Sequence, residues 1–156
     1  MVGYWKQMQK IVEDYRLTAE PWPASTKTIA AWAIQTGRWE LPAAAAINKC
    51  AADLADAMRQ EYFVDTKGRR VRLLHPVQKY VSGEQLTLWD DIRTMPRSDM
   101  QMSFQQNRKR IFWDCHQLKI DVDSYNDTHP NEEPIQMVFD FTMDLAEHEA
   151  GEDAAA

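Results

Sequence analysis

Four basic side chains lie within six residues around a glycine-containing turn. They are Lys67, Arg69, Arg70 and Arg72. Arginine and lysine side chains on a projecting hairpin contact phosphate oxygens, an interaction that positions a protein on nucleic acid without reading its sequence. The alternative is a solvated turn whose charges keep an exposed strand edge from aggregating. The spacing of the four residues leaves both interpretations open.

The basic residues fall in a predicted β-hairpin. Residues 62–64 and 69–74 are rich in strand-forming residues, and the Asp-Thr-Lys-Gly sequence between them is typical of a turn. Three amphipathic helices are predicted before it. Apolar residues recur at helical spacing over residues 4–19, Ser25 or Thr26 can cap a second helix that ends near Gly37, and Pro42 suits the first turn of a third.

Three helices followed by a basic hairpin is the element order of a winged helix, which residues 1–77 resemble. The resemblance implies a DNA-binding domain whose third helix is the recognition helix. The first turn of that helix is rich in alanine and offers no hydrogen bonds to base edges. Only Asn48, Lys49 and Arg59 are predicted contacts from it, so we expect phosphate-dominated, salt-sensitive binding. Many winged-helix domains bind proteins instead.

A second motif with chemical content is Gln85-Leu86-Thr87-Leu88-Trp89. It resembles the bacterial sliding-clamp-binding pentapeptide, in which Gln, Leu, a small polar residue, Leu and Phe dock into a hydrophobic pocket of the clamp. The resemblance implies that Gln85, Leu86, Leu88 and Trp89 bind a partner, with Trp89 in place of Phe. The alternative, which we favour, is that the three apolar side chains pack on their own domain, the default for such residues.

No pattern of catalytic or metal-binding residues is present. The histidines and cysteines share no metal-ligand spacing; they are His75, His116, His129, His148, Cys50 and Cys115. The glycine-rich phosphate loops and the nucleophile elbow are also missing from the sequence. We therefore predict a non-catalytic protein without metal or cofactor, with both cysteines reduced.

The second half of the chain is predicted to be a connector over residues 78–96, then a long helix and a short C-terminal helical or extended segment over 97–146. Phe104, Ile111, Leu118 and Val122 lie on alternating four- and three-residue steps along that helix, once Arg108 is counted in the register. Cys115 and Tyr125 continue the same pattern. A seam of this kind either closes an intrachain bundle or pairs two copies as a homodimer.

Charge is unevenly distributed along the sequence. The net charge is −6, yet the first 129 residues hold all 18 basic residues and 16 of the 24 acidic ones, a net of +2. Residues 147–156 are predicted to be a disordered acidic tail. The acidic total therefore argues against nucleic-acid binding by the tail but not by the rest of the chain.

The sequence contains neither an apolar run long enough to span a membrane nor the pattern of a signal peptide. We expect a cytoplasmic location and no membrane partner. The predicted fold is mainly α, with three winged-helix-like helices and a hairpin before the long helix and C-terminal segment. The predicted function is non-catalytic DNA binding, with duplex DNA as partner, as a regulator or accessory factor. The alternative is a protein-interaction adaptor of a bacterial or phage system, with Gln85–Trp89 as a candidate clamp-binding segment.

Overall fold

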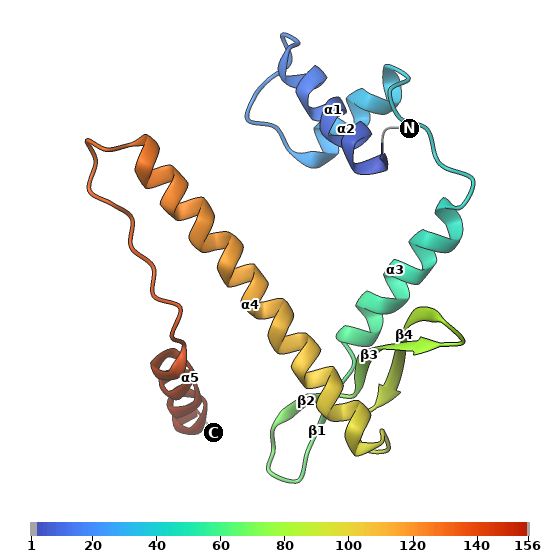
Figure 1. The fold of residues 1–156 in the computed structure, drawn as a ribbon, viewed down its shortest axis with the longest axis vertical. Coiled ribbons are helices and arrows are strands. Elements are labelled where there is room, and N and C mark those ends of the chain that lie inside the picture. Colours follow the sequence, from blue (N-terminus) through green and yellow to red (C-terminus); the bar gives the residue numbers. More distant parts are fainter. Residues whose placement is uncertain (1–2, 156) are drawn as a thin grey trace. The chain divides into compact units, whose positions relative to one another are not determined.

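The computed structural model describes residues 3–155 and is mainly α-helical (Figure 1). These residues form five helices and two β-hairpins, in the order α1 (Tyr4–Arg16), α2 (Thr26–Gln35), α3 (Ala45–Arg59), β1 (Tyr62–Val64), β2 (Arg70–Arg72), β3 (Leu74–Val81), β4 (Glu84–Asp91), α4 (Arg97–Thr128) and α5 (Thr142–Ala155). The predicted fold class is confirmed: three helices precede a hairpin, and a long helix follows.

The chain divides into two compact units, Met1–Asp56 and Ala57–Ala156. The predicted boundary after residue 77 therefore differs from the observed one, and the basic hairpin belongs to the second unit. Hydrogen bonds through Leu73 explain this assignment. Its N–H donates to the carbonyl of Glu61 (2.9 Å), and its carbonyl accepts from the N–H of Ile92 (2.9 Å). One residue thus joins the β1–β2 hairpin to the strands that follow.

Tyr15 is the centre of the first unit. Its side chain is fully buried, its ring lies edge-on to Trp32 with centroids 5.3 Å apart, and its hydroxyl donates to the carbonyl of Pro21 (2.9 Å). Ser25 caps α2 as predicted, because its hydroxyl accepts from the N–H of Thr28 (3.1 Å). One tyrosine therefore fixes α1, α2 and the proline-containing loop between them.

A second hairpin occupies most of the residues predicted to be a connector. Strands β3 and β4 pair antiparallel from Leu74↔Asp91 to Val81↔Glu84. The two residues between them, Ser82 (φ 53°) and Gly83 (φ 79°), both have positive φ, which matches the right-handed twist of a two-residue hairpin. The connector prediction was wrong because it treated Gly83 as a break in structure rather than as half of a turn.

The N-terminal turns of α4 pack on β3. The amide of Gln106 donates to the carbonyl of Gln78 (3.1 Å) and accepts from its N–H (2.9 Å). The hydroxyl of Ser103, which is buried, donates to the carbonyl of Pro76 (2.6 Å). The groups at residues 76 and 78 therefore point away from β4, and α4 occupies the outer edge of β3.

The C-terminal residues return along α4 and then form α5 (Figure 1). The amide of Asn126 bonds both the N–H and the carbonyl of Ile135 (2.9 Å each), which fixes where the extended segment 135–141 begins. Helix α5 covers residues 142–155, so most of the tail predicted to be disordered is helical. Alanine and glutamate are strong helix formers, a property that the charge argument did not weigh.

The core of the first unit gives a direct test. Tyr15→Phe removes one buried hydrogen-bond donor and should lower the free energy of unfolding by about 1 kcal/mol. Urea unfolding followed by circular dichroism measures it. Tyr80→Phe is the matched control, because Tyr80 is 75% exposed and the loss of its hydroxyl should change stability by less than about 0.5 kcal/mol. Equal effects would contradict the central position of Tyr15.

The assignment of Gln85–Trp89 to β4 gives a second test. Trp89 is half-buried and Leu88 is 40% exposed. Full burial would make truncation cost about 3–5 kcal/mol for Trp and 2–5 for Leu, so we expect about 2 for Trp89→Ala and about 1 for Leu88→Ala. Urea unfolding of both variants, beside a binding assay with a purified bacterial sliding clamp, is the measurement. If both variants kept the stability of the parent protein but lost the clamp binding that the parent showed, docking to the clamp would be favoured over packing within the domain.

Candidate nucleic-acid interface

The turn of the β1–β2 hairpin is organised by Asp65. Its carboxylate accepts from the backbone N–H groups of Lys67 and Arg69 (2.9 Å each) and from Nε of Arg69 (2.7 Å). These bonds, led by the one from the Arg69 backbone, lower the pKa of Asp65. Gly68 completes the turn with φ 78°. Arg69 therefore serves the turn, and its charge is neutralised locally.

Tyr62, Arg70 and Arg72 share one face of the hairpin. Tyr62 lies directly opposite Arg72 in the ladder, and Arg70 is the diagonal neighbour opposite Val64. The guanidinium carbon of Arg70 lies 3.9 Å from the centroid of the Tyr62 ring. The neighbouring Arg72 guanidinium, as a hydrogen-bond donor and a positive charge, lowers the pKa of the Tyr62 phenol. One aromatic side chain thus orients two guanidinium groups.

Both arginines on this face are accessible. Arg70 and Arg72 are exposed, and neither forms an ion pair with any carboxylate of residues 3–155. A guanidinium group without a carboxylate partner keeps its fork of N–H donors for an external anion, and phosphate is a geometrically suitable one. The predicted basic residues therefore differ in their partners. Arg69 is ion-paired with Asp65, whereas Arg70 and Arg72 both lie beside the Tyr62 ring.

The opposite face of the β1–β2 hairpin packs against other residues of the second unit. Phe63 and Val71 pair across the strands and are half-buried. The guanidinium carbon of Arg93 lies 5.4 Å from the Phe63 ring centroid, and Asp91 holds Arg93 through bonds of 2.7 and 3.0 Å. The side-chain hydrogen bond from Arg93 is the main cause that lowers the pKa of Asp91 to about 2. One face is thereby anchored while the arginine face stays open.

The three residues predicted to contact DNA from the third helix lie in α3. Lys49 is bound by Asp53 one turn later, with Nζ 2.6 and 2.7 Å from the two carboxylate oxygens. Arg59 lies over the Trp89 ring, 5.5 Å from its centroid. Asn48 is exposed. Lys49 and Arg59 therefore have intramolecular partners, which leaves less of their donor capacity for nucleic acid.

The residues of the clamp-like motif are in β4. Gln85, Thr87 and Trp89 pair with Tyr80, Gln78 and Pro76 on β3. Leu86 and Trp89 are half-buried. In the structure these residues are paired with β3, and the Trp89 ring lies beneath Arg59. Docking of the clamp-binding kind requires a free peptide whose apolar side chains are available to the partner. Partner binding through Gln85, Leu86, Leu88 and Trp89 remains a prediction.

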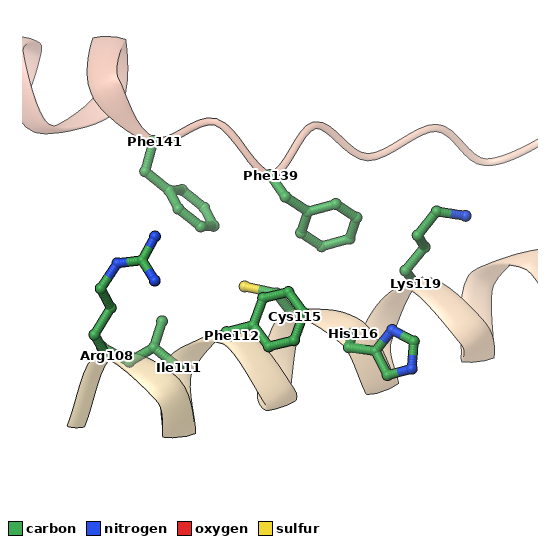
Figure 2. Close-up of a pocket in the computed structure, with 8 residues that line it drawn as sticks. All are labelled: Arg108, Ile111, Phe112, Cys115, His116, Lys119, Phe139 and Phe141. Carbon is green, nitrogen blue, oxygen red and sulfur yellow. The ribbon is translucent and has the colours of Figure 1, made fainter. Parts of the chain in front are cut away.

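An open groove lies between α4 and the extended C-terminal segment, with a volume of about 320 Å³. Figure 2 shows Phe139 and Phe141 projecting from that segment towards Phe112 and Cys115 on α4. Of the predicted seam, Ile111 lines this groove, while Phe104, Leu118 and Val122 do not. The groove is apolar at its centre, and Arg108, His116 and Lys119 complete its lining.

Tyr62 is the main residue that the sequence analysis missed. Its position opposite Arg72 follows from the observed register, in which the five residues Asp65–Arg69 separate the paired ends Val64 and Arg70. Counting outward from the predicted four-residue turn would have paired Tyr62 with Val71 instead, because a shift of one residue reverses the faces. Among residues 3–155, no three His, Cys, Asp or Glu side chains are grouped so that they could hold a metal ion.

None of the helices within the described residues combines the length and apolar character needed to cross a bilayer. No protein-family model, curated protein or solved structure matches the chain.

Proposed function

We propose that this protein is a non-catalytic DNA-binding regulator or accessory factor that holds the phosphate backbone of duplex DNA through the β1–β2 hairpin. The observation that carries the proposal is the pair Arg70 and Arg72, oriented by Tyr62 and without carboxylate partners among residues 3–155. The hairpin follows three helices in the chain, the element order of a winged helix, but α1, α2 and most of α3 belong to the first unit and the hairpin to the second. The proposal therefore rests on the arginine pair.

Phosphate contacts of this kind carry no sequence information. Two guanidinium groups on one strand face suit the phosphates of one DNA strand, and their N–H forks bind phosphate oxygens with charge-assisted hydrogen bonds. The partners of Lys49 and Arg59 leave few side chains for reading base edges. We therefore expect binding that depends strongly on salt and weakly on DNA sequence.

The alternative function is a protein-interaction adaptor. The observation that favours it is the amount of apolar side chain exposed on α4 and the C-terminal segment, where Trp113 is 54%, Ile120 46% and Val138 80% exposed. Apolar surface of this extent on several faces is typical of a protein that binds other proteins. Absence of duplex binding by the parent protein at low salt would leave this alternative as the better one.

The double variant Arg70→Ala/Arg72→Ala tests the DNA-binding proposal. If both groups contact phosphates, affinity for unrelated duplexes should fall by a similar factor, roughly ten-fold or more at about 50 mM salt, and the slope of log K against log salt should flatten by about 1.8. Fluorescence anisotropy with two duplexes of unrelated sequence, across a salt series, measures both quantities.

Arg69→Ala is the matched control. It removes the same charge from the same hairpin, yet Asp65 already neutralises that charge. We expect a clearly smaller change in affinity and slope than for either Arg70→Ala or Arg72→Ala. If Arg69→Ala weakened binding as much as those variants, general charge rather than the arrangement around Tyr62 would control the interaction.

A further inference from the structure

Most of α4 is not packed against the rest of the chain. The helix has 32 residues, and Ser103 is the one residue of it that is buried. Its contacts with β3 come from its first turns, through Asp99, Ser103, Gln106 and the ring of Phe104, which lies edge-on to His75 with centroids 5.7 Å apart. The remainder, from residue 107 to residue 128, extends for about 33 Å. A helix of this length usually obtains its stability from packing along an apolar face.

The accessible surface of the chain is larger than expected for compact bodies of its size. The accessible surface is 13329 Å². Two separate compact bodies with the lengths of the two units would together expose about 9,700 Å². The excess, roughly 3,600 Å², is several times the ~800 Å² per partner that a stable protein–protein interface covers. The excess is spread over both units, and the exposed apolar residues of α4 are part of it.

The exposed apolar stripe of α4 has a heptad period. Phe104, Ile111, Leu118 and Tyr125 recur every seven residues and are 51%, 49%, 42% and 45% exposed. These are the d positions of a coiled coil, and Arg108, Cys115 and Val122 then take the a positions. Of the d residues, Ile111 borders the groove beneath the C-terminal segment, while the other three lie outside its lining. The a residues Arg108 and Cys115 also border this groove, so the middle of the seam faces the C-terminal segment and its two ends, at Phe104 and from Leu118 to Tyr125, lie outside the groove lining.

The residues that flank the stripe determine which partner fits. In this register Asp114 is a g residue and Lys119 the e residue of the next heptad. In a parallel, in-register pair, each Asp114 faces Lys119 of the other helix, so one sequence supplies both members of two ion pairs. Within its own helix Lys119 is bound by Asp123 one turn later, so the interhelical pair would exchange one exposed carboxylate partner for another. An antiparallel pair would instead bring the g positions of the two helices together, and these include Asp114 and Asp121.

We propose that the occupant of this face is a second copy of the chain, and that two α4 helices form a parallel, in-register coiled coil over Phe104–Tyr125. Arg108, at an a position, is the polar residue of the seam. A single polar a residue costs stability but selects the register and the number of strands. The seam predicted from sequence (Phe104, Ile111, Leu118 and Val122) is contained in this interface.

Disulfide trapping tests the geometry directly. In a full-length Cys50→Ser/Cys115→Ser background, Leu118→Cys should form a disulfide-linked dimer under mild oxidation, because equivalent d residues face each other only in a parallel, in-register pair. Gln117→Cys is the matched control, since it lies on the outer face and should remain monomeric on a non-reducing gel. Circular dichroism verifies that both variants remain helical.

Charge exchange tests the ion pairs. Asp114→Lys alone, and Lys119→Asp alone, should each weaken the dimer roughly ten-fold or more in sedimentation equilibrium, because every pair becomes repulsive. Mixing the two variants should restore association, since both ion pairs of the mixed dimer then join opposite charges. A monomeric parent protein at high concentration, equal trapping at positions 117 and 118, or no recovery on mixing would each overturn the proposal.

Discussion

The second unit depends on the hydrogen bonds between the Gln106 amide and the backbone of Gln78. A side-chain amide has the same donor and acceptor pair as a peptide group, so Gln106 occupies the place of a neighbouring strand beside β3. Ser103 adds a bond to Pro76, whose ring lacks an N–H and is tolerated because that position faces away from β4. Through these contacts one helix is attached to a hairpin that would be marginal alone.

The arginine face of the other hairpin depends on this attachment. Leu73 links the two ladders, and the Asp91–Arg93 pair supports Phe63 from the side opposite Tyr62. The arginines thus stand on a strand pair that is fixed on one face and open on the other. One face packs against the protein and the other is accessible, which suits a surface that contacts a large, uniform, charged partner.

Periodicity and turn chemistry in the sequence were sufficient to predict α1, α2, the β1–β2 hairpin and the long helix. The prediction was wrong at segments whose sequence is compatible with two different structures. Gly83 ends structure in a connector and also forms hairpin turns, and only the pairing of Val77 with Leu88 across the strands distinguishes these cases. Acidic, alanine-rich segments likewise suit both a tail and a helix such as α5. For the candidate site, the four basic residues were evident, but Asp65 and Tyr62 separate them into a structural and an accessible set, which composition does not encode.

The position of Gln106 has a consequence for how the β3–β4 sheet can grow. Identical copies can stack into a continuous fibril sheet only when each copy offers a free edge on both sides, one for each neighbour. Here the far side of β3 is already occupied by a side chain and a hydroxyl. Only β4 retains an accessible edge, and Glu84, Asp90 and Asp91 place negative charge at its two ends. If two copies paired edge to edge through β4, the two outer edges of the combined sheet would both be occupied β3 strands. Such an assembly would end with two copies, which favours a closed pair over a polymer.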